Sequence, residues 1–334
     1  MYLSQDKGAG VKMKTKQESI FSSKTLTYFL QLADTMNYTQ AAQLLGITQP
    51  ALTQQIKKLE RTVGAPLFYS VGKKLHLSEA GRTMLAATHD IYEVLNRAAD
   101  EIQQTTSSET GQISVGILAS VEDSAFTAFA AEYYKQHPDI ELVYRMMTRH
   151  EIWEQLENNQ IDLAIMYLPD PTIKNWKPYD TRKIFDEQLM FLHHDDKLSQ
   201  RKRIHFRDTI NSPWVTYPED YFLSHLLKEA YKNQMVDYPK AVAQFTTPAQ
   251  LTQFLNRTGV NTALPMTYYQ AHREQIHAYA VSFEPAVNFN LSFVYRKGKE
   301  VIPRIQTFLD AFYAYLDDED YLSRVHDNRV TLNE

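Results

Sequence analysis

The sequence predicts a mixed α/β protein with three parts: an all-α N-terminal module, a long single helix and a larger α/β region. Three observations support this prediction. Two short apolar helical patterns meet at Gly46, an apolar seam then continues through about 28 residues, and strand and helix patterns alternate from Gln112 onward. A chain of 334 residues is also long for one hydrophobic core, which favours two or three domains.

The chain contains no cysteine. Disulfides, thiolate nucleophiles, cysteine-ligated zinc and thiol-based redox sensing are therefore excluded. There is also no apolar run of about 18 residues, and the basic N-terminus lacks the apolar stretch of a secretory signal. We therefore expect a cytoplasmic protein with no membrane partner.

The net charge of −5 is unevenly distributed along the chain. Residues 1–20 carry +2 and residues 21–77 carry +4, which leaves −11 for residues 78–334. A basic N-terminal module on an acidic body is typical of a nucleic-acid binder with a separate regulatory part. Charge alone does not distinguish this arrangement from a chance excess of basic residues.

The N-terminal module is expected over residues 21–80, after a tail at residues 1–20 that has few large apolar side chains and should be disordered. A helical pattern begins near Lys24. A second, short helix is expected to have Thr39 as its N-cap and Gly46 just beyond its end.

The third helix of the module follows this glycine directly. Thr48 is expected to cap it, and Pro50 is tolerated in its first turn. Its apolar residues recur at i, i+4 and i+7 and form a narrow buried stripe: Leu52, Ile56 and Leu59. Two helices joined at a tight glycine turn match a helix-turn-helix, and a hairpin pattern turning at Gly72 adds a wing.

A long linker helix is expected within residues 81–110, ending in a polar stretch. Its apolar seam has alternating spacings of four and three residues: Met84, Thr88, Ile91, Leu95, Ala98 and Ile102. The seam could pack on its own domain. Its regularity, beside a module of DNA-binding type, favours a homodimer, with Met84, Ile91, Leu95, Ala98 and Ile102 as dimerisation residues.

The α/β region begins with strand patterns at residues 112–118, 140–144 and 161–167, separated by helical patterns. Thr148 and Glu151 have the spacing of a capping box at the start of the second helix. Alternating strands and helices predict a parallel sheet, with ligand sites at the carboxyl ends of its strands.

The stretch "LTYFLQLADTMNYTQAAQLLGITQPALTQQIKKLERTVGAPLF…LHLSEAG" resembles the DNA-binding domain of LysR-type transcriptional regulators. The segments "DLAI" at residues 162–165 and "GVNTALP" at residues 259–265 extend the resemblance into the α/β region. It implies a two-lobed effector-binding domain at residues 111–300, similar to a periplasmic binding protein. The first lobe would comprise residues 111–168 and 265–300, the second residues 169–264, and a C-terminal helix and tail residues 301–334.

The resemblance also implies a function. We expect a non-enzymatic, sequence-specific regulator that binds double-stranded promoter DNA and is controlled by a small-molecule effector. A homotetramer made from dimers and contacts with RNA polymerase are further expectations. The alternatives are a nonspecific architectural DNA-binding protein and, less favoured, an α/β enzyme, for which we find no nucleophile elbow, phosphate-binding glycine loop or metal-ligand spacing.

Two positions depart from the family pattern. Ser70 stands where the wing usually has an arginine, and Gln54 stands where many members have one. The loss of positive charge predicts fewer phosphate contacts and a greater dependence on base or shape readout.

The candidate DNA contacts lie off the apolar stripe of the third helix and on the wing. Amide side chains pair with adenine, lysine reaches guanine or phosphate, and small apolar groups contact thymine methyls. Base contacts are predicted for Gln49, Pro50, Ala51, Thr53, Gln54 and Lys57. Phosphate contacts are predicted for Thr39, Lys58, Lys73 and Lys74.

The candidate effector contacts follow predicted strands or begin predicted helices, where free amides favour anions. They are Ser120, Thr148, Arg149, Thr216, Thr246 and Thr247. Each hydroxyl could instead serve only as a helix cap. Arg149 suggests an organic anion as effector. No cofactor is expected. No metal is expected either, because the neighbouring His193 and His194 would point to opposite faces of a strand.

Overall fold

A computed structural model describes residues 22–105, 108–170 and 178–326. The predicted tail at residues 1–20, part of the polar stretch after the linker helix and the last eight residues lie outside this range. The chain divides into two compact units, one up to Asn96 and one from Arg97 onward. Within the described ranges no helix is both long and apolar enough to cross a membrane.

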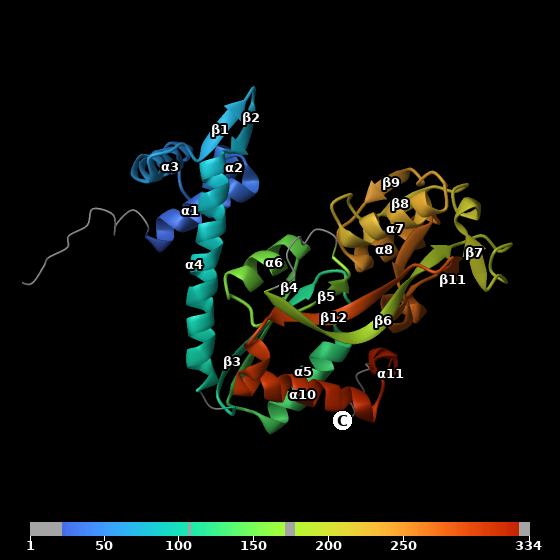
Figure 1. The fold of residues 1–334 in the computed structure, drawn as a ribbon. Helices are drawn as coiled ribbons and strands as arrows, with labels where there is room; N and C mark the ends of the chain where they lie inside the picture. Colours follow the sequence, from blue (N-terminus) through green and yellow to red (C-terminus); the bar gives the residue numbers. More distant parts are fainter. Residues whose placement is uncertain (1–21, 106–107, 171–177, 327–334) are drawn as a thin grey trace, which may run out of the picture. The chain divides into compact units, whose positions relative to one another are not determined.

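The N-terminal unit contains a helix-turn-helix with a wing and the greater part of a long helix (Figure 1). Its elements are α1 (Ser23–Thr35), α2 (Tyr38–Leu44), α3 (Gln49–Val63), β1 (Phe68–Val71), β2 (Lys74–Leu77) and α4 (Glu79–Gln104).

Short-range signals determine where these helices begin and end. The Thr48 side chain caps α3 by accepting from the backbone N–H of Ala51, as predicted, and Pro50 lies in the first turn. Gly46 adopts φ 64° just beyond α2, a left-handed conformation that glycine tolerates. The predicted cap of α2 was wrong: the Asn37 side chain accepts from the N–H groups of Thr39 and Gln40, so Thr39 lies inside the helix.

The core of this module is small and apolar. The predicted stripe of α3 is fully buried against Phe29 and Leu32 of α1 and against α2. In the wing, Phe68 pairs with Leu77 and packs on Phe29, with ring centroids 5.5 Å apart. Met84 of α4 also belongs to this core.

The second unit is an α/β domain whose first lobe follows the predicted strand–helix alternation. It contains β3 (Gly111–Leu118), α5 (Ser124–Gln136), β4 (Ile140–Met147), α6 (Arg149–Glu157) and β5 (Leu163–Leu168). Strand β3 pairs in parallel with β4 and β5, so the carboxyl ends of all three strands lie at the same edge.

Two long strands connect this lobe with a second one. Strand β6 (Tyr179–His193) pairs through its first part with β12 (Asn288–Arg296) and through its last part with β10 and β11. Strand β12 also pairs with β5, which places it in the middle of an eight-stranded sheet.

The second lobe has short strands with helices beside them. Its elements are β7 (Arg203–His205), η1 (Phe206–Asp208), β8 (Trp214–Thr216), α7 (Phe222–Asn233), β9 (Ala241–Gln244), α8 (Pro248–Thr258), β10 (Thr262–Pro265), α9 (Met266–Ala271), η2 (Arg273–Gln275) and β11 (Tyr279–Glu284). Because β11 pairs with β7 and the end of β6, we group residues up to Glu284 with this lobe. The sequence division at residue 265 is corrected accordingly, since the return to the first lobe is β12.

The chain ends with η3 (Lys299–Val301), α10 (Pro303–Asp318) and α11 (Tyr321–His326). Helix α10 packs beside α5 (Figure 1) through an aromatic cluster in which the Phe126 and Phe312 rings stack at 5.5 Å. The short α11 touches both α5 and α9, and its Tyr321 is fully buried. It therefore contacts elements of both lobes.

Candidate nucleic-acid interface and ligand pocket

Helix α3 separates its side chains into a buried face and an exposed face. Opposite the fully buried stripe, five predicted DNA-contact residues are exposed: Gln49, Pro50, Gln54, Lys57 and Lys58. Ala51 and Thr53 are half-buried. The arrangement presents amides, a proline and two lysines on the surface of a capped helix, as a recognition helix requires.

Gln49 and Thr53 are already bonded to one another on this face. The Gln49 side-chain amide donates to the Thr53 hydroxyl at 3.0 Å, and that hydroxyl donates to the Gln49 carbonyl at 2.9 Å. This pairing orders two side chains one turn apart. Gln54 has an exposed side chain beside them.

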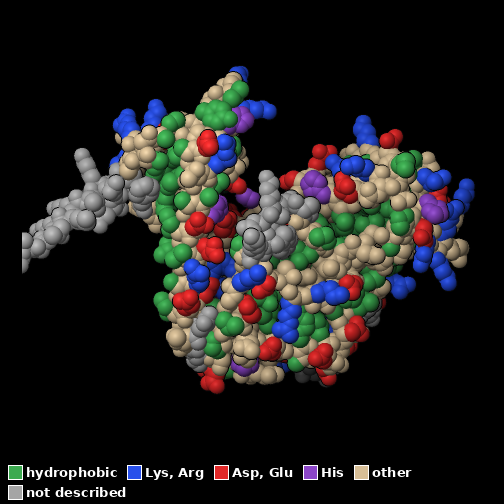
Figure 2. Space-filling view, in the orientation of Figure 1, with side chains coloured by type: hydrophobic (Ala, Val, Ile, Leu, Met, Phe, Trp, Pro, Cys, Tyr) green, Lys and Arg blue, Asp and Glu red, His purple; other side chains and the backbone are tan. Residues whose placement is uncertain are grey.

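Basic residues lie on α3 and on the wing, where Figure 2 shows Lys and Arg side chains at the tip of the hairpin. Lys73 and Lys74 are exposed in and beside the turn at Gly72, which has φ 61°. Ser70 is exposed on β1 and carries no charge. Thr39 is exposed at the start of α2, and its N–H is held by Asn37.

Glu60 has a structural role that the sequence did not indicate. Its Oε1 accepts from the backbone N–H groups of Leu67 at 2.8 Å and Phe68 at 3.2 Å. The carboxylate thereby joins the end of α3 to the first strand of the wing. The only signal in the sequence was its place in the family-like stretch.

In the first lobe the structure brings three predicted effector residues together around Tyr167. The Tyr167 hydroxyl donates to the Ser120 carbonyl at 3.1 Å, and the Tyr167 carbonyl accepts from the Arg149 guanidinium at 2.9 Å. Thr148 precedes Arg149 and forms the predicted capping box with Glu151. These residues follow β3 and β4, at the carboxyl edge of the sheet.

The charge of Arg149 is balanced within the protein. Its Nη1 lies 2.5 Å from a carboxylate oxygen of the fully buried Asp170, which also accepts from the Trp153 indole at 2.7 Å. The guanidinium carbon lies 4.2 Å from the ring centroid of Phe222, at the start of α7 in the second lobe. Burial lowers the pKa of Arg149, and Asp170 opposes that shift. An anionic effector would therefore meet a guanidinium that already has a counter-ion.

The other three predicted residues lie in the second lobe. Thr216 is buried at the end of β8, and its carbonyl accepts from the N–H of Phe245 at 3.0 Å. Thr246 and Thr247 follow Phe245, and Thr247 caps α8. The two sets of three are thus separate clusters, with Arg149 and Phe222 in contact between the lobes.

A small recess in the second lobe is lined by hydroxyl groups. Thr216, Tyr217, Ser224 and Tyr238 contribute to its wall, together with apolar residues of β6, β8, β10 and α7. Its free volume of about 10 Å³ corresponds to about one water molecule. The buried hydroxyl of Tyr217 has no hydrogen-bond partner among the described residues. Such a group favours a ligand or water that accepts a hydrogen bond.

Two carboxylates near the lobe junction were missed by the sequence analysis. Glu187 is buried and accepts from the N–H groups of Met266 and Thr267 at the start of α9. Burial raises its pKa to about 7, against the opposing effect of these hydrogen bonds. Glu122, after β3, lies 2.8 Å from Nε2 of His272, after α9.

The pair formed by Glu122 and His272 connects the two lobes. Its hydrogen bond raises the pKa of His272. Burial acts to raise the pKa of Glu122, but the hydrogen bond and charge of His272 outweigh it, so that pKa is lowered. Neither residue stood out in the sequence, because their positions are separated by 150 residues.

The linker helix has an apolar seam that is exposed in the single chain. Leu95 is 58% exposed and Ile102 is 69% exposed; Ile91 and Ala98 are also exposed. Met84 differs: it is buried in the core of the winged module, so it is a core residue here and is not available to a partner.

The His193–Asp196 stretch shows a local role for its first residue. Buried His193 accepts through Nδ1 from the N–H of Asp195 at 3.2 Å, whereas His194 is exposed. The described part of the chain contains no group of three or more His, Asp or Glu residues placed to hold a metal ion.

Two family models match the chain. The "LysR substrate binding domain" matches residues 106–317, and the "Bacterial regulatory helix-turn-helix protein, lysR family" matches residues 23–82. The first alone covers more than half of the chain.

Similar proteins agree with these matches. The transcriptional activator CmpR of Synechocystis sp. is 25% identical, over 86% of this chain and 93% of its own. The transcriptional regulator CzcR of Bacillus thuringiensis is 25% identical, over 88% of this chain and 94% of its own.

Solved structures share the fold. An H2O2-bound OxyR mutant of Corynebacterium glutamicum has a TM-score of 0.56 and 17% identity, covering 90% of this chain and 94% of that one. The PA01 protein of Pseudomonas aeruginosa, a LysR-type regulator by its description, has a TM-score of 0.53 and 16% identity, covering 88% and 98%. The chain belongs to the LysR family of transcriptional regulators, as a sequence-specific DNA-binding protein with an effector-binding domain and not as an enzyme.

Proposed function

We propose that this regulator reads promoter DNA through the exposed face of α3 and holds the phosphate backbone through the wing. The observation that supports this most strongly is the opposition on α3 between a fully buried stripe and an exposed face of amides and lysines. The base contacts are assigned to Gln49, Pro50, Ala51, Thr53, Gln54 and Lys57. The phosphate contacts are assigned to Thr39, Lys58, Lys73 and Lys74.

Substituting Gln54 by alanine tests this assignment. A bidentate amide–base contact contributes about 1–3 kcal/mol of discrimination. We therefore expect Gln54→Ala to weaken binding to a duplex selected in vitro with the wild-type protein by roughly fivefold to a hundredfold. Binding to an unrelated duplex should change by less than about twofold. Titration of both duplexes by fluorescence anisotropy measures the two effects.

Two further variants make this test specific. Gln43→Ala removes an exposed glutamine of α2 and should leave both affinities unchanged. Lys58→Ala should weaken both duplexes equally and reduce the salt dependence of binding by about one counter-ion. An equal loss on both duplexes for Gln54→Ala would make Gln54 a phosphate contact.

We propose that the regulator is at least a homodimer joined through α4. Exposed apolar side chains on one helix face, including Ile91, Leu95, Ala98 and Ile102, support this. The same proposal includes three further points. Two such dimers form a tetramer, the regulator contacts RNA polymerase at the promoter, and it acts in the cytoplasm, where promoter DNA lies.

We propose that the small-molecule effector binds where the two lobes meet, at Ser120, Thr148, Arg149, Thr216, Thr246 and Thr247. The unpartnered hydroxyl of Tyr217 supports hydrogen bonding to an acceptor in the nearby recess. If the effector is an organic anion, it must compete with Asp170 for the Arg149 guanidinium.

Substituting Asp170 by asparagine tests whether Arg149 binds an anionic effector. The introduced amide keeps an oxygen that can accept from Trp153 but removes the counter-charge, so simple carboxylates such as benzoate and succinate should bind about tenfold more tightly. Their dissociation constants can be obtained from concentration-dependent thermal shifts. Asp310→Asn, which removes the partner of the exposed Arg182, is the matched control and should have no effect. Unchanged affinity in Asp170→Asn would count against an anionic effector at Arg149.

A further inference from the structure

The last turns of α4 belong to the effector-binding domain. The helix is continuous from Glu79 to Gln104, but the division between the compact units falls inside it, between Asn96 and Arg97. Residues 97–104 are therefore packed with the α/β unit. Any change of that unit at this point acts directly on the helix that connects it to the DNA-binding module.

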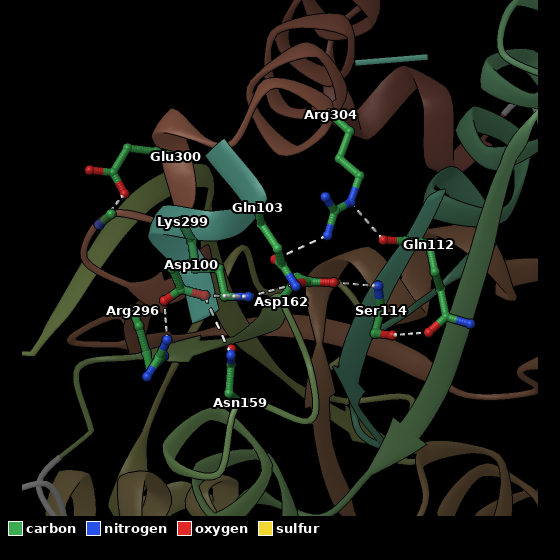
Figure 3. Close-up of polar contacts among 11 residues, drawn as sticks. Asp100, Gln103, Gln112, Ser114, Asn159, Asp162, Arg296, Lys299, Glu300 and Arg304 are labelled. Atoms are coloured by element: carbon green, nitrogen blue, oxygen red, sulfur yellow. Dashed lines mark hydrogen bonds and ion pairs between the residues drawn. The ribbon is translucent and has the colours of Figure 1, made fainter. Parts of the chain in front are cut away.

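A buried cluster of four charged residues holds this end of α4 (Figure 3). Asp100 is only 3% exposed and forms ion pairs with Arg296, at the end of β12, and with Lys299 of η3, whose Nζ lies 3.2 Å from it. Lys299 also lies 2.7 Å from the carboxylate of Asp162. The two cations and two carboxylates balance one another, which buried charges require.

The cluster is bonded to the framework of the first lobe. The second oxygen of Asp162 accepts from the backbone N–H of Ser114 in β3 at 2.9 Å. The amide of Asn159 donates to Asp100 at 3.4 Å. Asp100 is the member of the cluster that lies on α4; the others come from the α/β domain itself. Its carboxylate is thus the direct ionic link between this helix and the sheet.

A second contact lies three residues further along α4. The Gln103 side-chain oxygen accepts from the Arg304 guanidinium at 3.1 Å, and Arg304 also donates to the Gln112 carbonyl at 2.9 Å. Residues 100 and 103 lie on the same side of a helix. Two contacts on one side fix both the position of the helix end and its rotation about its own axis.

Strand β12 connects this cluster to the lobe junction. Near its start, Phe289 packs edge-on against Tyr167, with ring centroids 4.8 Å apart, and against Phe222, at 5.9 Å. Arg296 is its last residue, about 23 Å away at the rise of a β-strand. Because β12 is hydrogen-bonded to β5 on one side and β6 on the other, it cannot slide without disturbing both pairings.

We propose that Asp100, supported by Gln103, is the positioning residue through which the lobe junction sets α4 and thereby the DNA-binding modules. A change at Phe222 or Tyr167 moves Phe289, β12 transmits it to Arg296, and Asp100 transfers it to the helix. This rests on the proposed function, in that the state of the lobe junction controls DNA binding. The physical basis for this transmission is the continuous series of packed and bonded groups from Phe222 to Asp100, whose coupling free energy can be measured.

A double-mutant cycle with DNA as the only ligand tests the proposal. Phe222→Leu changes the junction and is expected to alter the dissociation constant for the in vitro selected duplex by roughly three- to thirtyfold. In an Asp100→Asn background, the same substitution should alter it by less than about twofold. If Asp100 only stabilises the fold, Phe222→Leu should change the dissociation constant by the same factor in both backgrounds, so that the two substitutions are additive. That result would overturn the proposal, as would an absence of any effect of Phe222→Leu in the wild-type background.

Matched variants separate coupling from loss of stability. Asp162→Asn makes the same chemical change in the same cluster but leaves the Asp100–Arg296 contact of α4 in place, so the Phe222→Leu effect should persist. If Asp162→Asn also abolished the Phe222→Leu effect, that effect would depend on the stability of the whole cluster and not on Asp100. Gln103→Ala keeps all four charges and should reduce the Phe222→Leu effect partially. It decides the question if Asp100→Asn does not fold, because an undiminished effect in Gln103→Ala would then contradict the proposal.

Failure of the proposed function is recognised separately. If the wild-type protein does not select a preferred duplex from a random library, the assignment of α3 fails before any variant is compared. If it selects one but the cycle is additive, only the role of Asp100 fails.

Discussion

Gly81→Ala is expected to unfold or greatly weaken the winged module and to abolish DNA binding. A Cβ atom at this position would lie 2.1 Å from the Leu67 carbonyl oxygen and 2.8 Å from a methyl group of Leu77. A backbone oxygen cannot rotate away as a side chain can, so α4 must separate from the start of the wing. We expect a loss of about 3 kcal/mol or more, or about 12 °C in the calorimetric midpoint of the module.

Gly46→Ala is the matched control for this substitution. Gly46 has a left-handed backbone with φ 64°, but a Cβ there would meet no atom within 4 Å. The expected cost is the backbone strain alone, about 1–2 kcal/mol. Equal, small losses in the two variants would mean that α4 can move away from Leu67 at little cost.

Glu187→Gln is expected to change how stability depends on pH. Burial raises the pKa of Glu187 to about 7 in the folded protein, from an ordinary value of 4.5. Below the ordinary value the group is protonated in both states. Between the two values the unfolded chain ionises first, so the folded state loses stability as the pH rises, until the folded pKa is passed.

Glutamine cannot ionise, so the variant does not experience this loss. The unfolding free energy of Glu187→Gln minus that of the wild type should therefore rise by about 2–3 kcal/mol between about pH 5 and pH 8. Urea unfolding of both proteins across this range measures the difference. Glu154→Gln, which makes the same substitution at an exposed site of α6, is the matched control. A flat difference for Glu187→Gln would mean that the pKa of Glu187 is not raised in the folded protein.

Features that depend on neighbours in the sequence could be predicted. The Thr48 cap, the capping box of Thr148 and Glu151, and the turns at Gly46 and Gly72 each involve residues within a few positions. The N-cap of α2 was mispredicted because Asn37 and Thr39 are both good capping residues. The choice between them depends on where α1 ends, at Met36 with φ 47°.

Features that depend on distant pairing could not be predicted. The lobe boundary was misplaced because β11 joins β6 and β7 across about 80 to 90 residues of sequence, and its apolar pattern suits either lobe. The candidate ligand residues remain predictions made from their positions in the sequence. The counter-ion of Arg149 could not be predicted, because it depends on where the segment after β5 folds back. Asp100 resembled an ordinary acidic residue on a helix surface, and its partners lie about 200 residues away.

The position of Asp100 has a practical consequence for dividing the protein. A fragment beginning at residue 111, where the α/β pattern starts, would contain Arg296 and Lys299 with Asp162 as their one remaining carboxylate in the cluster. Cutting there would leave an excess positive charge in the interior and also remove Gln103, which is one acceptor of Arg304. A fragment intended for ligand screening should instead begin before Arg97. The end of the linker helix then stays in the fragment, and Asp100 neutralises the positive charge of Arg296 and Lys299.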